Sequence, residues 1–263
     1  MEPTFRPESC ILPRTMSDHD DAARYAAEAG AVLLDLRARA ETDGDSLGNA
    51  LGDAGDDDAN RRLLELLQAE HPEDAVLSEE SADDPRRLDA HRVWIVDPLD
   101  GTREFTEAGR TDWAVHVALW ERGPGLTAGA VALPAQALVL STAEPPVVPD
   151  GGGRQLRIVV SRTRPPAAAR RVADALDAEL VAMGSAGAKT MAVVTGDVDA
   201  YVHSGGQYEW DSAAPAAVAA AAGLHVSRLD GSPLEYNRAD PWLPDLVVCR
   251  AELAEVIISS AAE

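Results

Sequence analysis

The chain has 263 residues, enough for a sizeable core, and its 46% hydrophobic and 26% charged residues are typical of a globular protein. A net charge of −22 disfavours binding to a nucleic acid polymer or to an anionic membrane. No run approaches the roughly 20 apolar residues that span a bilayer, and two cysteines match neither a disulfide framework nor a metal-ligand spacing.

The first residues carry three prolines and lack the apolar stretch of a secretory signal. We therefore interpret residues 1–16 as a flexible extension and expect a cytoplasmic protein. A clean helical pattern begins after Met16, so either Met1 or Met16 can be the true start.

The first half of the chain predicts two helices followed by strands. Apolar residues recur at helical spacing over residues 18–39 and again over residues 57–70. Short apolar runs then predict strands at residues 75–77, 93–96, 113–120, 127–133 and 137–141. The segment PPVVPDGGG, between Glu144 and Arg154, is the best linker candidate.

Beyond this linker the pattern alternates between strands and helices, which predicts α/β layers. The predicted strands are residues 156–160, 180–183, 200–203 and 246–249. The predicted helices are one opened by Pro165 and Pro166 and those at residues 186–195, 212–222 and 251–262. We expect one half at residues 17–145, a linker at 146–155 and a second half at 156–263.

Three acidic clusters lie where a predicted strand ends or a helix begins. They are LSEES at residues 77–81, WIVDPLDGT at residues 94–102 and EWDSAA at residues 209–214. Any one of them alone is more simply explained as a helix cap or a loop charge.

The second cluster is harder to explain in that way. Asp97 follows an apolar strand, Pro98 fixes the backbone, and Asp100 comes three residues later. Two carboxylates that converge on one turn repel each other, and a shared divalent cation is the usual remedy. Oxygen ligands without nearby Cys or His pairs favour Mg²⁺ over zinc. The amides of Gly101 and Thr102 are expected to start a helix, which binds phosphate; the cluster therefore predicts a phosphoryl-transfer site.

Taken in order, the Glu-Glu pair, Asp-Pro-Leu-Asp-Gly-Thr and Trp-Asp-Ser-Ala-Ala resemble the lithium-sensitive phosphatase superfamily. That superfamily includes inositol monophosphatases, fructose-1,6-bisphosphatases and 3′(2′),5′-bisphosphate nucleotidases. The resemblance runs from Asp18 to the C-terminus. It implies an α/β fold, a layered α-β-α-β-α sandwich of two halves, and a lithium-sensitive phosphatase with two or three Mg²⁺ ions per site.

The resemblance also implies roles for individual residues. Metal ligands would be Glu79, Asp97, the Leu99 carbonyl, Asp100 and Asp211, with Asp97 bridging two metals. Catalytic residues would be Thr102, which orients the attacking water, Asp56, which pairs with that threonine, and the nearby Glu80. The lysine and threonine of a family motif are missing near residue 56, so the choice among Asp56, Asp57 and Asp58 stays open, as does a third metal.

The substrate contacts follow from segments that resemble the bacterial nucleotidase branch. They would be Asp100, Gly101, Thr102, Arg103, Ser161, Arg162, Gly184, Ser185, Lys189, Asp211 and Tyr236. Lys189, the only lysine, or Arg162 would hold a phosphate that is not cleaved. The alternatives are a solvated strand end for Arg162 and packing under the last loop for Tyr236. We expect His116 in the core rather than in the site.

The expected function is hydrolysis of adenosine 3′,5′-bisphosphate to AMP and phosphate, which the family parallel places in by-product recycling during sulfate assimilation. The alternative is inositol-1-monophosphatase or fructose-1,6-bisphosphatase activity. A noncatalytic metal-binding protein with this fold would have lost an acidic ligand, and none is lost. The expected partner is a small phosphorylated molecule, and the sequence leaves the oligomeric state open, with a homodimer as one candidate.

Overall fold

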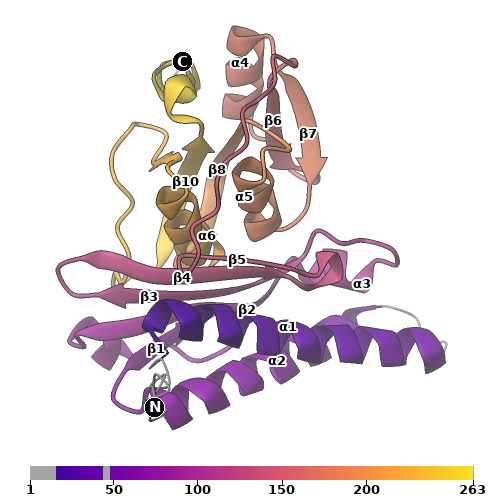
Figure 1. Cartoon of the computed structure of the whole chain (residues 1–263), viewed down its shortest axis with the longest axis vertical. Helices are drawn as coiled ribbons and strands as arrows, with labels where there is room; N and C mark the ends of the chain where they lie inside the picture. Colours follow the sequence, from indigo (N-terminus) through magenta and orange to yellow (C-terminus); the bar gives the residue numbers. More distant parts are fainter. Residues whose placement is uncertain (1–15, 44–47, 263) are drawn as a thin grey trace, which may run out of the picture.

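The computed structural model describes residues 16–43 and 48–262, and in this part of the chain the helices and sheets form five alternating layers (Figure 1). Two helices lie at one end, followed by a sheet, two helices, a second sheet and two further helices. The predicted α-β-α-β-α sandwich is confirmed. The predicted extension, except for Met16, lies outside the described residues, as does Cys10.

The first sheet has the strand order β1-β2-β3-β4-β5. Its strands are β1 (Ala75–Ser78), β2 (Arg92–Asp100), β3 (Ala114–Glu121), β4 (Gly125–Leu133) and β5 (Leu138–Ser141). Only the β1–β2 pair within it is parallel. The central strands β2 and β3 are buried on both faces, which explains why their sequences are apolar nearly throughout. All five predicted strands are confirmed.

Helices α1 (Asp18–Asp43) and α2 (Asn49–Glu70) cover the outer face of this sheet. The predicted start of α2 at residue 57 is wrong, because the helix begins eight residues earlier. Gly52 and Gly55 weaken the helical pattern in the sequence. The structure needs them, because a Cβ atom at Gly55 would lie 2.9 Å from both Leu99 Cδ2 and Phe105 Cε1. Close packing thus lets α2 reach the turn that follows β2.

The second sheet has the strand order β7-β6-β8-β10-β9. Its strands are β6 (Arg157–Ser161), β7 (Glu179–Met183), β8 (Ala200–Tyr208), β9 (His225–Ser227) and β10 (Trp242–Cys249). Helices α4 (Ala167–Leu176) and α7 (Ala254–Ala262) pack on its outer face, with a short 3₁₀ turn at Ala251–Leu253 where the sequence predicts continuous helix. The predicted end of β8 at residue 203 is wrong, since the strand continues through Gly205 and Gly206, which have positive φ angles.

The middle layer is formed by α5 (Ala186–Val194) and α6 (Glu209–Ala221), which pack between the two sheets. Both are almost entirely buried and alanine-rich, so neither presents a polar face as a surface helix would. The short helix α3 (Thr102–Thr106) follows β2 directly and confirms the helix start predicted at Gly101 and Thr102.

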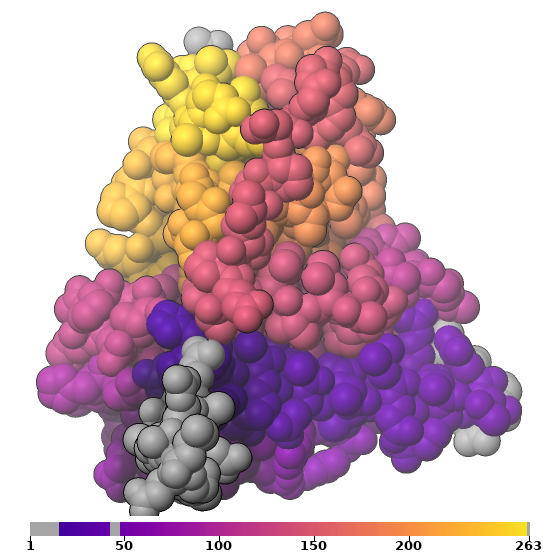
Figure 2. Space-filling model, viewed as in Figure 1, coloured from indigo at the N-terminus to yellow at the C-terminus, as the bar shows by residue number. Residues whose placement is uncertain are grey.

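Residues 142–156 join the two sheets without helix or strand. Figures 1 and 2 show this segment running over the surface from the first sheet toward the second. We retain the division into halves at residues 146–155 as a proposal. The middle layer belongs to the second half by sequence, yet it covers the first sheet as well.

Candidate metal and phosphate site

Three carboxylates meet between the two halves of the chain. Asp97 and Asp100 come from the end of β2 and Asp211 from the first turn of α6, and a ligand oxygen from each lies within 4.8 Å of the others. In a regular strand, residues three apart point to opposite faces. The pairing of β2 with β3 is irregular between Asp97 and Asp100, and this irregularity brings both side chains to one place.

Asp97 is fully buried, and the cationic group nearest to its Oδ2 is the His116 imidazole, whose Nδ1 lies 3.8 Å away. Its Oδ1 accepts the Leu99 N–H at 3.1 Å, whereas its Oδ2 has no hydrogen-bond partner in the described structure. Burial raises the pKa of Asp97, and repulsion from Glu79, Asp100 and Asp211 raises it further. An unpartnered buried oxygen among carboxylates fits a hard divalent cation such as Mg²⁺.

Asp211 and Glu79 share this environment. Burial raises the pKa of Asp211 to about 6, with Asp100 adding repulsion. Glu79 follows β1, and its N–H donates to the Val96 carbonyl at 3.3 Å, beside Asp97. Desolvation by the surrounding protein raises the pKa of Glu79 to about 8, with repulsion from Asp211 contributing, although much of the residue stays accessible to solvent. The four carboxylates predicted as ligands therefore repel one another electrostatically.

Asp100 is held differently from Asp97. Its Oδ2 accepts hydrogen bonds from the Ser185 hydroxyl and from the Gly187 N–H, the latter at 2.7 Å. Burial alone would raise the pKa of Asp100, but nearby His116, Lys189 and Ser185 outweigh burial and lower it. Asp100 is thus a fixed anion at the N-terminal end of α5.

His116 is buried in β3, as expected, yet it belongs to the site and not only to the core. Its Nε2 lies 3.2 Å from Asp100 Oδ2, and its Nδ1–H donates to the Trp210 carbonyl at 3.0 Å. A Cβ atom at Gly187 would collide with the imidazole, so glycine is required there. The sequence offered no signal for this contact, because a histidine inside an apolar strand has no spacing that points to α5 or α6.

Thr102 lies against the predicted catalytic aspartate. Its Oγ1 is 3.4 Å from Asp56 Oδ1 and 3.3 Å from the Leu99 carbonyl oxygen, so its hydroxyl proton can reach either. Desolvation, with repulsion from Glu80, raises the pKa of Asp56 to about 7. Asp58 instead pairs with Arg61 on the outer side of α2. Of the candidate aspartates, the structure brings Asp56 to Thr102.

Asp56→Asn is expected to lower kcat about 100-fold or more and to change KM little, because the variant removes the group that holds Thr102 and can accept a proton. Thr102→Val should do the same, and the double variant should be no worse than either single one, since the two act as a unit. Steady-state kinetics on all three, with Asp58→Asn as the control on the same helix, tests the pair. Additive losses would contradict it.

Lys189 lines a cavity of about 380 Å³ next to the carboxylates, together with Ser161, Ser185, Asp100 and Asp211. Its ammonium donates to the Ser185 carbonyl at 2.5 Å and to the Gly184 carbonyl at 3.2 Å, so two of its three protons hold the backbone. Burial lowers the pKa of Lys189. The lysine therefore positions the turn before α5 and leaves one N–H for a ligand.

Four other residues predicted as substrate contacts do not line this cavity. Arg162 is paired with Glu104 and Glu107 and does not line the cavity. The Gly184 N–H donates to Asp112 at 2.6 Å. Arg103 is exposed on α3. Tyr236 is buried with its hydroxyl 3.2 Å from Ser212 Oγ and lines a different cavity, next to Trp120, which agrees with the packing alternative.

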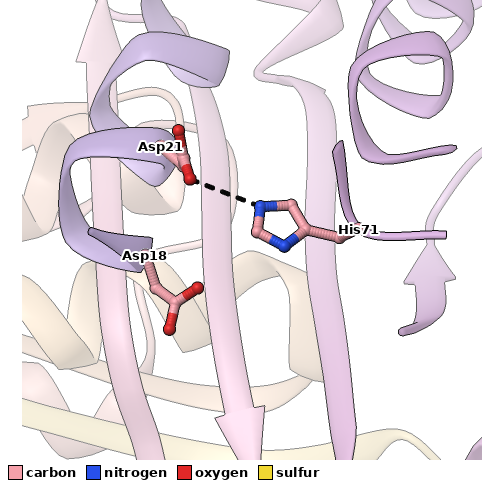
Figure 3. Close-up of side chains that lie close together, drawn as sticks. All are labelled: Asp18, Asp21 and His71. Carbon is pink, nitrogen blue, oxygen red and sulfur yellow. Dashed lines mark ion pairs between the residues drawn. The ribbon is translucent and has the colours of Figure 1, made fainter. Parts of the chain in front are cut away.

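A second group of possible metal-binding residues, Asp18, Asp21 and His71, lies on the outer side of the first sheet (Figure 3). His71 Nε2 faces Asp21 Oδ2 at 3.4 Å. Asp21 also pairs with Arg24 at 2.8 Å, and Asp18 with Arg92 at 2.8 Å. These arginines already neutralise both carboxylates, so this group is an ion-pair network that ties α1 and α2 to the sheet.

Comparisons with known proteins find relatives of this chain in sequence and in fold. The inositol monophosphatase family model matches residues 17–263. A Mycobacterium leprae (strain TN) protein named 3′-phosphoadenosine 5′-phosphate phosphatase is 55% identical over 259 residues, which cover 94% of each chain. The 3′(2′),5′-bisphosphate nucleotidase CysQ of Escherichia coli (strain K12) is 34% identical over 205 residues, 72% of this chain and 81% of that one. The crystal structure of CysQ from Bacteroides thetaiotaomicron superposes with a TM-score of 0.71 at 25% identity, covering 88% of this chain and 96% of the other.

Proposed function

The chain belongs to the inositol monophosphatase family, and on that premise we propose that it hydrolyses adenosine 3′,5′-bisphosphate to AMP and phosphate. The observation that carries the proposal is the cluster of buried Asp97 and Asp100 with partly buried Asp211, beside a cavity that Lys189 also lines. A relative that is 55% identical over nearly the full length and is named for this type of substrate supports the same choice over inositol phosphate.

Two groups of side chains have separate tasks in the proposed site. Glu79, Asp97, Asp100, Asp211 and the Leu99 carbonyl would hold two or three Mg²⁺ ions. When bound, these ions would supply Lewis-acid polarisation of the phosphoryl group and would lower the pKa of a bound water. The unpartnered Oδ2 of Asp97 and the all-oxygen donor set fit such ions.

The chain's own residues then position the reacting atoms. Thr102 orients a water molecule for attack on phosphorus, and Asp56 accepts its proton, for which a pKa near 7 is suitable. As the water oxygen bonds to phosphorus, the bond between phosphorus and the 3′-oxygen breaks, and the 3′-oxygen takes up a proton from solvent water. Asp97 and Asp100 are buried, and the low polarity of their surroundings strengthens their electrostatic interactions.

A substrate panel tests the proposal directly. In Mg²⁺, kcat/KM for adenosine 3′,5′-bisphosphate is expected to exceed that for inositol 1-phosphate and fructose 1,6-bisphosphate by at least about 10-fold. One additional charge-assisted contact of about 1.5–3 kcal/mol is enough for that ratio. Phosphate release measured on the same enzyme preparation gives the comparison. A preference for inositol 1-phosphate would refute the nucleotide substrate while leaving the phosphatase assignment intact.

We also propose that the enzyme works in the cytoplasm on a small phosphorylated molecule. Within residues 16–43 and 48–262, no helix combines the length and apolarity needed to cross a membrane. The strongly acidic chain would repel polyanions, whereas a small anion could be drawn in by metal ions bound at the carboxylates.

A further inference from the structure

The cavity that adjoins the carboxylates has an outer part that the proposed reaction does not use. It opens at one edge of the second sheet, where the carboxyl ends of β6 and β8 meet the amino end of the antiparallel strand β10. Such edges are common ligand sites in α/β proteins. Arg164 lines the cavity just after β6, Tyr208 at the end of β8 and Trp242 at the start of β10.

Arg164 is a cation that the protein leaves available. Arg162, two residues earlier, is neutralised by Glu104 and Glu107, whereas no carboxylate in the described part of the chain pairs with Arg164. The backbone N–H of Arg164 donates to Ser161 Oγ at 3.3 Å and fixes the start of this loop. Arg164 itself is exposed.

The other basic groups of the cavity are less available to a ligand. Lys189 is buried and holds two backbone carbonyls. Burial lowers the pKa of His203, so it is neutral near pH 7, and its Nε2–H donates to the Gly206 carbonyl at 3.0 Å. In a chain with a net charge of −22, an unpaired guanidinium at the mouth of a cavity favours an anionic ligand there.

Two aromatic rings stand beside this cation. Tyr208 and Trp242 are directly opposite each other in the β8–β10 pair, so both side chains point to the same face of the sheet. They are 46% and 44% exposed, so both rings are accessible to a ligand. Tyr208 is stacked on Trp210 with ring centres 4.8 Å apart, and a Cβ atom at Gly206 would lie 2.5 Å from Trp242 Nε1. Both rings are therefore held in place.

We propose that this outer part is a nucleotide subsite, in which Arg164 binds the phosphate that is not cleaved and Tyr208 with Trp242 form the surface on which the base stacks. The inference rests on the proposed function and adds the residues that select a nucleoside bisphosphate. On a ribose, the base on C1′ and the 5′-phosphate carried by C5′ leave the ring at different carbons, so they can reach separate contacts. Arg164 follows β6 and Trp242 begins β10, and these two strands flank β8 on opposite sides.

The product AMP tests the subsite without the metal site, because it carries the base and the 5′-phosphate but lacks the 3′-phosphate. Binding of AMP and of adenosine is measured by calorimetry in EDTA. Arg164→Ala is expected to raise the Kd for AMP about 10-fold and to leave adenosine within about twofold. Trp242→Ala and Tyr208→Ala should raise both Kd values at least about 5-fold, because base stacking is lost.

Arg170→Ala is the matched control, since Arg170 is an exposed arginine on α4, away from the cavity. It should bind both ligands as the wild type does. Kinetics give a second readout: Arg164→Ala should raise KM for adenosine 3′,5′-bisphosphate about 10-fold and leave kcat/KM for 3′-AMP, which lacks the 5′-phosphate, nearly unchanged. Unchanged melting temperatures show that the variants are folded.

The subsite would be refuted if Arg164→Ala bound AMP as tightly as the wild type, or if Arg162→Ala lost affinity for AMP instead. Equal losses for AMP and adenosine in Arg164→Ala would also exclude a phosphate contact. If the wild type fails to hydrolyse adenosine 3′,5′-bisphosphate but AMP binding depends on Arg164, the proposed function is wrong and the subsite stands. If the wild type hydrolyses that substrate and Arg164→Ala leaves the Kd for AMP unchanged, only the subsite is wrong.

Discussion

Asp97→Asn is expected to lower kcat at least about 100-fold while the protein stays folded. Asparagine has nearly the same shape, but it is a neutral and weaker ligand for Mg²⁺, and the chemistry that depends on the ions supplies several kcal/mol. The melting temperature in EDTA should stay the same or rise, because the variant removes one of four carboxylates that repel one another in a buried site.

The two measurements together identify a ligand rather than a structural residue. A residue needed for packing would lose stability and activity together, whereas Asp97 should lose activity alone. Asp35→Asn, at an exposed carboxylate on α1, is the control and should match the wild type in both assays. Near-normal activity with a native far-UV spectrum would rule out Asp97 as a metal ligand.

Removal of divalent cations is expected to abolish turnover, and added Mg²⁺ should restore it. The ligand set is all oxygen, which suits Mg²⁺, and Ca²⁺ in excess should inhibit because it is larger and accepts looser geometry. Inhibition by Li⁺ is expected on the family resemblance alone. A titration of phosphatase activity against each cation, after chelation and desalting, measures these effects.

Binding should also be visible without catalysis. At a Mg²⁺ concentration of about 100 times Kd, the ion should stabilise the wild type by about 2.7 kcal/mol, and its melting temperature should rise. The same addition should shift Asp97→Asn much less. Full activity in EDTA would refute the metal mechanism, whereas resistance to Li⁺ would only argue against the lithium-sensitive branch.

The closeness of Asp97 and Asp100 could be predicted from sequence because a local motif encodes it. Asp97, Pro98 and Asp100 lie on one turn, and this spacing is visible without any knowledge of the fold. The resemblance left the choice among Asp56, Asp57 and Asp58 open, and the structure favours Asp56, whose Oδ1 lies 3.4 Å from Thr102 Oγ1. Residues that are close together in sequence can therefore be recognised as neighbours before the fold is known.

Contacts that depend on distant partners could not be predicted. Nothing in the sequence separates Arg162 from Arg164, because Glu104 and Glu107, which neutralise Arg162, come from a segment more than 50 residues earlier. Tyr236 and Trp242 are likewise two aromatic residues close together in sequence, and only the pairing of β10 with β8 decides that Trp242 lines the cavity. The start of α2 was missed for a similar reason, since its glycines are explained by neighbours in α3 and β2.

The shared middle layer has a consequence for how the chain folds. When synthesis has produced only the first half, the inner face of the first sheet has no cover, because α6 ends at Ala221. A nascent chain in that state exposes apolar strands, which makes it prone to aggregation until the later helices dock. Pairing elements so far apart in sequence is also slow. The proposed linker at residues 146–155 is therefore a poor place to cut the gene for separate expression, and refolding yield should depend on the two halves being present together.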